Sequence, residues 1–534
     1  MYDILIKNGL IVDGSGETPF YADLTIADGK IARIAPQIDG EARRIINAEG
    51  LQVAPGFIDS HTHSDTIIFT GSDSYNYLEQ GVTTQIAGQC GSSPVPYSEG
   101  NLEEAKLRLP PEEYERWVAL AQSPASFMAA AEQASIGTNM AFFIGHGALR
   151  AKAMGYANRA PDEAEMACMK AILVQAMEAG YLGFTSGLVY VPSAYAQQAE
   201  LAELARAMAP YKGVYASHIR GEGDHVLRSV KEAIAIGEGS GAPVLISHLK
   251  VMGRHNEGQS AALLAEIESA NKRGVSVCAD QYPYNASSAP LSSQIPPKYL
   301  EGGTAAMLER LMDPAIRQQI LYSIFNEVDE FESSIYSAGF DGCLIVEARL
   351  TPQYINKTIG QIARMEGKEP IDVMCDVLLE NQGVMQGIYF NQSASDLLRI
   401  MGHPLVYCGS DWSDYPDERV DSEQIGGGHP RGTGTMIRRL ELVRDFRLRS
   451  MEESIRNITY DTAQAIGLAE QGLLKRGRDA NITVFRYDEL HATADFTHPY
   501  RPNTGIHWVL VNGDVAVEHG RASGHRSGKV LPRR

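Results

Sequence analysis

The stretch FIDSHTHSD, residues 57–65, closes an apolar run directly after the turn Pro55-Gly56. Side chains on a β-strand alternate between its two faces, so His61 and His63 would point the same way and could reach one metal ion. By itself the pattern fits equally well a strand end that carries two polar residues. Its position at the carboxyl end of an apolar strand favours the metal site, because barrel enzymes gather their chemistry at that edge.

Further apolar segments of the same kind follow along the chain and bring the number of candidate strands to eight. They are residues 81–90, 140–150, 182–190, 213–224, 243–250, 275–284 and 404–414. Most follow a stretch with helical apolar spacing, such as EAEMACMKAILVQAMEAG at 163–180, which ends in a glycine suited to a helix cap. Alternating strands and helices in this number predict an α/β fold, a (β/α)8 TIM-like barrel.

One interval breaks this alternation, roughly residues 286–350, between the seventh and eighth strands. It is too long for an ordinary loop of such a barrel. We expect an insertion after strand 7 that packs over the barrel mouth; the alternative is a lengthened seventh helical region.

The two ends of the chain share a different texture, with short alternating strands and tight turns. Asn8-Gly9, Asp28-Gly29 and Asn512-Gly513 are strong hairpin signals. Residues 1–54 and 472–534 are therefore expected to form one small β-sandwich domain built from both termini. Residues 55–471 remain for the barrel domain and its insertion.

Charge and composition restrict the possible partners. The 534 residues include 47 Lys and Arg against 66 Asp and Glu, a formal net charge of -19, which argues against nucleic acid and anionic membrane surfaces. No apolar stretch approaches the roughly 20 residues that span a bilayer. The N-terminal run has Asp3 and Lys7 inside it and lacks the pattern of a signal peptide, so a cytoplasmic location is expected. Six cysteines without a CxxC pair indicate neither a disulfide framework nor a structural zinc knuckle.

Nearly every candidate strand ends in a residue able to bind metal or move a proton. These are His61, His63, Cys90, His146, His218, His248 and Asp411. A single buried histidine is more often a core residue, but packing gives no reason for this coincidence at matching strand ends, so we expect a metal centre. Nitrogen, sulfur and oxygen donors together suit Zn²⁺, with other divalent transition metals as competitors. Zinc would activate a water, and Asp411 would take its proton and return it to the leaving group, which is metal-assisted hydrolysis.

The chain resembles the amidohydrolase superfamily and, more narrowly, the N-acyl-D-amino-acid deacylases, or D-aminoacylases. The resemblance rests on PGFIDSHTHSD, GVTTQIAGQCGSSPVP, ASHIRGEGD, ISHLK, DQYPYNASS, GSDWSD and HPRGTGT, with DILIKNGLIVDGSG and WVLVNGDVAVEHG at the two ends, and so spans nearly the full length. Hydantoinases and dihydroorotases, which are similar in fold, bridge two metals with a carboxylated lysine on the fourth strand. The fourth strand here reads GFTSGLVY and has no lysine.

The resemblance implies a role for each ligand. Cys90, His218 and His248 would form a tight zinc site. His61, His63 and Asp411 would form a second, more weakly occupied site, either alone or with Cys90 as a shared ligand, and Asp411 would also be the general acid/base. His146 matches no ligand position and is expected to be structural or to support a ligand.

A substrate carboxylate needs a cation in so acidic a chain. The resemblance points to Lys250 and Tyr282, and spacing adds Arg220, two residues after His218, and Arg431 in GGGHPRGTG. For each of these cations the alternative is an ordinary solvated surface residue. Tyr190 is a candidate hydrogen-bond donor to the scissile carbonyl.

The loop NASSAPLSSQIPPKYL, residues 285–300, lacks the arginine that members preferring D-glutamate or D-aspartate derivatives place there. We therefore expect a small-molecule substrate of the type N-acyl-D-amino acid with a neutral, apolar or aromatic side chain. A cyclic amidase of the hydantoinase kind or a dipeptidase is the nearest alternative function. A non-catalytic assembly protein with this fold is a further one, although such proteins lose ligands that this chain keeps.

Overall fold

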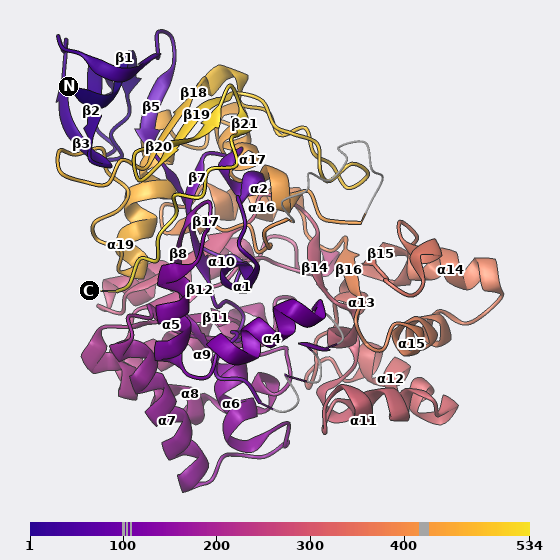
Figure 1. The fold of residues 1–534 in the computed structure, drawn as a ribbon. Helices are drawn as coiled ribbons and strands as arrows, with labels where there is room; N and C mark the ends of the chain where they lie inside the picture. The colour runs from indigo at the N-terminus through magenta and orange to yellow at the C-terminus, as the bar shows by residue number, and fades with distance from the viewer. Residues whose placement is uncertain (99–101, 103–104, 107–108, 416–426, 534) are drawn as a thin grey trace.

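The computed structural model describes residues 1–533 except 99–101, 103–104, 107–108 and 416–426 (Figure 1). Eight segments at the centre of the chain form parallel strands. They are β6 (Phe57–Asp59), β7 (Val82–Ala87), β8 (Asn139–Phe142) continued by β9 (Ile144–Gly145), β10 (Gly183–Gly187), β11 (Val214–His218), β12 (Val244–Ile246), β13 (Val277–Gln281) and β17 (Val406–Cys408). They lie at the eight positions expected from the sequence.

Two partial sheets make up the barrel wall. One has the order β6-β7-β8 and the other the order β17-β13-β12-β11-β10-β9. Only Phe143 separates β8 from β9, so the two sheets share the third barrel strand. The wall closes between the first and last strands, because the Ser60 amide donates to the Cys408 carbonyl at 3.1 Å and Thr62 pairs with Trp412 in a parallel bridge. The expected (β/α)8 barrel is confirmed.

Helices cover the outside of this wall. The principal ones are α5 (Pro124–Gln133), α6 (His146–Met154), α7 (Glu163–Glu178), α8 (Gln198–Met208), α9 (Val226–Ser240), α10 (Ser260–Lys272), α16 (Ala394–Met401) and α17 (Arg431–Asp445). Sequence signals set their ends: Asp162 and Glu165 form a capping box at the start of α7. Gly241, with φ 76°, ends α9 in the left-handed region that glycine adopts freely. None of the helices among the described residues is long and apolar enough to cross a bilayer.

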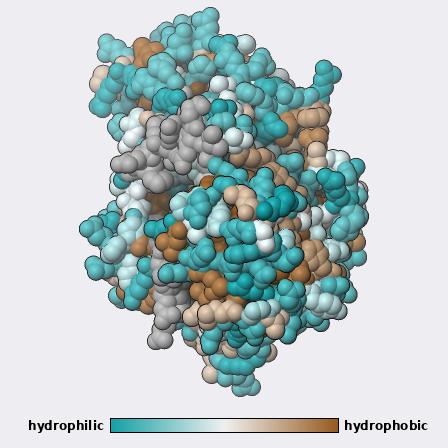
Figure 2. Space-filling model, turned by 90° about the vertical axis from the view of Figure 1, so that its right-hand side faces the viewer, coloured by the Kyte–Doolittle hydropathy of each residue, from teal (hydrophilic) through white to brown (hydrophobic). Residues whose placement is uncertain are grey.

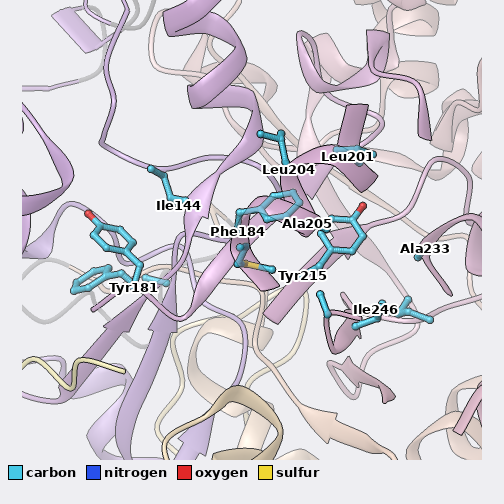
Figure 3. Close-up of a cluster of buried hydrophobic side chains, with 14 of the residues drawn as sticks. Ile144, Tyr181, Phe184, Leu201, Leu204, Ala205, Tyr215, Ala233 and Ile246 are labelled. Atoms are coloured by element: carbon cyan, nitrogen blue, oxygen red, sulfur yellow. The ribbon is translucent and has the colours of Figure 1, made fainter. Parts of the chain in front are cut away.

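The main core lies between barrel strands and outer helices. Phe184 and Tyr215 on β10 and β11 pack with Leu201 and Leu204 of α8 in this cluster (Figure 3). A second cluster fills the barrel interior, where Ile58, Ile86 and other inward residues meet α19 (Thr462–Ile466) at the end away from the ligands. These two cores fix the strands that carry the candidate ligands.

Both termini contribute to one nine-stranded sheet, at the top left of Figure 1. Its strands are β1 (Tyr2–Ile11), β2 (Phe20–Ala27), β3 (Lys30–Ala35), β4 (Ala42–Asn47), β5 (Gln52–Pro55), β18 (Ile482–Phe485), β19 (Ile506–Val511), β20 (Asp514–Glu518) and β21 (Arg521–Ala522). The two ends share a core that includes Ile6, Leu24, Val53, Ile482 and Leu510. The small β domain built from both ends is therefore present.

The last residues of the chain leave this sheet and return to the barrel. Val530 pairs with Met140 of β8, and the Arg533 amide donates to the Gly180 carbonyl at 2.8 Å. The tail thus runs along the end of the barrel opposite the ligands, whereas the sequence suggested that it belongs to the β domain.

An inserted layer separates β13 from β17, at the right of Figure 1. Its sheet has the order β14-β16-β15, from β14 (Ser287–Pro290), β15 (Cys343–Glu347) and β16 (Gln386–Tyr389). Its helices are α11 (Thr304–Leu311), α12 (Pro314–Asn326), α13 (Ser334–Ala338), α14 (Ile359–Glu366) and α15 (Pro370–Glu380). The layer extends to Tyr389, beyond the expected end near residue 350, because β16 completes its sheet. Its outward side, which faces the viewer in Figure 2, is mainly hydrophilic with separate hydrophobic patches.

Candidate metal centre

The six expected ligands come together at the carboxyl ends of the barrel strands. His61 and His63 follow β6, Cys90 follows β7, His218 ends β11, His248 follows β12, and Asp411 follows β17. Their donor atoms form two groups that share Cys90, and the atoms of each group lie within 4.8 Å of one another. One group contains Cys90, His218 and His248, and the other contains His61, His63, Cys90 and Asp411.

The donor atoms of these side chains face a common centre. The Cys90 Sγ lies 3.3 Å from His61 Nε2 and 3.4 Å from His248 Nε2. The Asp411 Oδ1 lies 3.0 Å from His63 Nε2 and 3.5 Å from His61 Nε2. Three of the imidazoles therefore present the same nitrogen, Nε2, to the shared sulfur or carboxylate.

Three of the six ligands adopt a backbone conformation that costs free energy. Cys90 and Asp411 have φ 53° and His248 has φ 34°. Such positive φ values are uncommon outside glycine and persist where the surroundings enforce them. Here the His248 amide donates to Asp280 Oδ1 at 2.6 Å, and the Asp411 amide donates to the His61 carbonyl at 2.8 Å. The backbone is thus fixed in the form that turns these side chains inward.

Two buried carboxylates orient the imidazoles, and the sequence reasoning did not single them out. Asp280 Oδ2 lies 3.4 Å from His61 Nδ1. Glu222 Oε1 lies 3.1 Å from His248 Nδ1 and 2.5 Å from Lys250 Nζ, and this ammonium nitrogen also lies 2.6 Å from His248 Nδ1. A carboxylate on the far nitrogen fixes the tautomer of a metal-binding histidine and leaves Nε2 free for the metal. The available signal was an acid inside an apolar strand, VCADQ, and an acid four residues after His218.

The charge states suit a metal cation. Burial alone would raise the pKa of the Cys90 thiol, but the imidazoles of His61 and His248 lower it well below its usual value. Burial would also raise the pKa of Asp411, but Arg431 and His248 hold it well below the usual range. A thiolate with two imidazoles is a donor set typical of zinc, and the group that contains Asp411 adds a carboxylate, so the residues present fit this ion.

Four of the expected substrate-binding residues surround the same centre. Tyr190, Lys250 and Tyr282 line one cavity together with Asp411. The guanidinium of Arg431 lies 4.8 Å from the Tyr282 ring centroid, and its Nη1 is 2.8 Å from Asp411 Oδ2. The Tyr190 ring centroid lies 5.0 Å from that of His218.

Arg220 is directed elsewhere. Its guanidinium binds Glu232 at 2.9 Å and the backbone carbonyls of Ala194 and Ala196 at 3.1 and 2.9 Å. The expected position facing the substrate assumed a regular strand, but β11 ends at His218, so alternation no longer applies two residues later. The structure favours a role for Arg220 in holding the neighbouring loop.

His146 also lies outside both ligand groups. It is fully buried at the start of α6 and hydrogen-bonds to Ser193 and Glu200. This agrees with the expectation of a structural or supporting residue.

A barrel with such donors at its strand ends defines the class of metal-dependent barrel hydrolases. A sequence model of a protein family, described as "Amidohydrolase family", matches residues 44–517 of this chain. The chain is 32% identical over 537 residues to the D-aminoacylase of Alcaligenes xylosoxydans xylosoxydans, covering 100% of this chain and 98% of that protein. A solved N-acyl-D-glutamate deacylase from Bordetella bronchiseptica, complexed with zinc and a phosphonate mimic of the tetrahedral intermediate, has a TM-score of 0.82 at 32% identity and covers 99% of each chain. A solved D-aminoacylase described by one-metal activation and second-metal attenuation of a binuclear centre has a TM-score of 0.83 at 30% identity over 100% of each chain.

The chain therefore belongs to the amidohydrolase family, in the group of D-aminoacylases and N-acyl-D-amino-acid deacylases.

Proposed function

We propose that this protein is a zinc-dependent deacylase that hydrolyses N-acyl-D-amino acids to a carboxylate and a free D-amino acid. The observation that carries the proposal is the convergence of Cys90, His218 and His248 on one centre beside Asp411. The names of the relatives support the class of substrate and its D configuration. The relative with one-metal activation supports a single tight zinc at the Cys90, His218 and His248 group and a second, weaker site.

The chemistry divides between the metal and the side chains. When bound, zinc acts as a Lewis acid towards the amide carbonyl and lowers the pKa of a water to about 7. Asp411 accepts the proton of the attacking water and transfers it to the leaving amine. Arg431, 2.8 Å from Asp411 Oδ2, keeps this carboxylate ionised and fixed in direction. The Tyr190 hydroxyl donates a hydrogen bond to the scissile carbonyl oxygen as negative charge develops there.

The substrate carboxylate is held by the cations near Tyr282. Lys250 and Arg431 are buried cations at 5.6 and 4.8 Å from the centroid of the Tyr282 ring. Among the described residues the Arg431 Nε has no hydrogen-bond partner, although it is buried. A buried donor of this kind is costly to leave unpaired, and an arriving carboxylate satisfies it.

The side chain of the substrate is neutral. The lining contributed by residues 285–300 is small or uncharged, with Ser287, Ser288, Ala289, Ser293 and Gln294. Lys298, the cation of this loop, is paired with Glu327 at 2.5 Å on the surface. Glu332 also lines the cavity and offers no positive charge to a second substrate carboxylate.

The test is hydrolysis of N-acetyl-D-leucine, N-acetyl-L-leucine and N-acetyl-D-glutamate with the zinc content measured in parallel. We expect kcat/KM to be highest for N-acetyl-D-leucine. A preference for the L enantiomer contradicts the proposed D configuration of the substrate. A preference for the glutamate derivative contradicts the proposed neutral side chain. If the protein opens hydantoin and does not hydrolyse N-acyl amino acids, a cyclic amidase is favoured. If it binds no zinc and hydrolyses no substrate, a non-catalytic assembly protein is favoured. The cytoplasmic location and the lack of a nucleic-acid partner stay predictions from the sequence.

A further inference from the structure

Four buried side chains form a hydrogen-bonded chain behind the loop that carries Tyr190. His146 Nδ1 lies 2.7 Å from Ser193 Oγ, and its Nε2 lies 2.9 Å from Glu200 Oε1. Arg150, one turn further along α6, binds both oxygens of Glu200 through Nη1 at 2.7 and 2.6 Å. All four side chains are nearly excluded from solvent.

The partners set the direction of these hydrogen bonds. Burial raises the pKa of Glu200, but hydrogen bonds and charge from His146 and Arg150 lower it overall. The Glu200 carboxylate is therefore an acceptor, and His146 Nε2 carries the hydrogen. His146 Nδ1, on the other side of the ring, shares its hydrogen bond with the Ser193 hydroxyl. Each of the four side chains has at least one partner in the network, although the Arg150 Nε has none among the described residues, and such a connected buried network restricts the movement of its members.

This network fixes a segment that has no regular strand to support it. Ser193 lies three residues after Tyr190 and opens the 3-10 turn Ser193–Tyr195. The Ala194 amide donates to the Tyr190 carbonyl at 2.8 Å. On the other side Arg220 binds the carbonyls of Ala194 and Ala196. The loop is thus held at two points directly after Tyr190.

The start of α6 also touches the backbone beside Cys90. The Gly147 amide donates to the Gly91 carbonyl at 2.9 Å. A Cβ on Gly91 would lie 3.2 Å from Ser193 Oγ and 2.6 Å from the Gly187 amide nitrogen. No side chain fits between these segments, so the position of Ser193 is tightly defined relative to the metal centre.

The order Ser193, His146, Glu200 resembles a nucleophile, a base and an orienting acid. Ser193 is only 2% exposed and is not among the residues that line the cavity beside His218, His248 and Asp411. Its hydroxyl therefore meets no substrate. Ser193 therefore affects the reaction only through the position of the loop that it holds.

We propose that His146 and Ser193 are positioning residues, which together with Glu200 fix the Tyr190 hydroxyl over the scissile carbonyl. This inference rests on the proposed deacylase function. It assigns to His146 a role in transition-state stabilisation, since Tyr190 acts on charge that develops during attack. Misplacing such a donor by about 1 Å costs up to about 100-fold in rate.

The test is a double-mutant cycle with N-acetyl-D-leucine. Ser193→Ala, which removes one oxygen, should lower kcat by about 10- to 100-fold and change KM by less than about threefold. When Tyr190→Phe is already present, Ser193→Ala should lower kcat by less than about threefold, because the donor it positions is gone. His146→Phe should follow the same pattern.

Ser260→Ala is the matched control. Ser260 is a buried serine that binds the Asp396 carboxylate, which Arg399 also approaches, but it joins α10 to α16 away from the Tyr190 loop. It should leave kcat unchanged in both backgrounds.

Equal losses of kcat from Ser193→Ala with and without Tyr190 overturn the inference. Loss of zinc from Ser193→Ala also overturns it, because the role would then be at the metal centre. If the wild-type protein hydrolyses no N-acyl-D-amino acid, the proposed function fails and this inference with it. An active wild type with additive losses refutes this inference alone.

Discussion

Glu222 offers the sharpest test of how the metal centre is held. Its carboxylate sits between the buried ammonium of Lys250 at 2.5 Å and His248 Nδ1 at 3.1 Å. Burial raises the pKa of Glu222, but Lys250, His218 and His248 together hold it well below its usual value, so the carboxylate is ionised at neutral pH. Glu222→Gln keeps the length and an acceptor oxygen and removes the charge.

The expected effects follow from these two contacts. A hydrogen bond to a charged group contributes about 1.5–3 kcal/mol and a neutral one about 1 kcal/mol, so weakening both should cost about 1–4 kcal/mol of stability. For zinc only the contact to His248 counts. Loss of a carboxylate that orients a metal-binding histidine typically lowers metal affinity by about 10- to 100-fold, or about 1.4–2.7 kcal/mol.

Zinc affinity is measured by competition with a chromophoric chelator at pH 7.5 under reducing conditions. Glu332→Gln is the matched control, because Glu332 accepts the Glu222 backbone amide at 2.8 Å and contacts no ligand. We expect Glu332→Gln to leave the zinc affinity unchanged and Glu222→Gln to lower it by about 10- to 100-fold. Unchanged affinity in Glu222→Gln, or equal losses in both variants, would refute the orienting role of this carboxylate.

Further predictions concern the reaction, the metal, the pH dependence and the specificity. Asp411→Asn should lower kcat by about 10³-fold while zinc stays at the Cys90, His218 and His248 group, as read from metal content; loss of that zinc would mean that the ligands are misassigned. Removal of metal with a chelator should abolish hydrolysis, and added Zn²⁺ should restore it, whereas activity in metal-free protein would contradict the mechanism. Burial raises the pKa of Glu332 from 4.5 to about 7, so the folded state binds this proton more tightly than the unfolded chain and loses stability as pH rises. About 2 kcal/mol should be lost between pH 5.5 and 8, and urea unfolding should show Glu332→Gln free of this loss. Gln294→Arg places a cation in the cavity and should raise the kcat/KM ratio of N-acetyl-D-glutamate to N-acetyl-D-leucine by about tenfold or more; an unchanged ratio would move the side-chain subsite elsewhere.

The features that the sequence predicts well are those carried by local periodicity. Eight apolar segments separated by helical spacing are enough to place the barrel strands, and chemistry-bearing residues at their ends are enough to indicate the ligands. The first inference, that His61 and His63 share a face, holds although β6 already ends at Asp59. The bridge between Thr62 and Trp412 continues the pairing past the assigned strand and so preserves the alternation.

The features that the sequence does not predict depend on contacts between distant segments. Arg220 shows the failure of spacing once a strand has ended. Glu222 and Asp280 orient histidines that belong to other strands, and a spacing argument within one segment does not reveal such a contact. The sequence also places the end of the inserted layer too early. The helices α14 and α15 have the same amphipathic pattern as a barrel helix, so only the pairing of β16 with β14 and β15 shows that they belong to the layer, which reaches Tyr389.

One physical requirement explains why buried carboxylates recur around this centre. Five of the six ligands lie beyond the ends of their strands, where the sheet no longer fixes the backbone. Side chains supply the missing constraint: Asp59 accepts the amides of His61 and Ser410 at 3.1 and 2.9 Å, and Asp280 accepts that of His248 at 2.6 Å. Glu222 does the same for the imidazole ring of His248. Because Asp59, Asp280 and Glu222 each join one strand end to another, the metal geometry depends on the closed barrel as a whole, and removing any one of them should loosen a ligand that another strand carries.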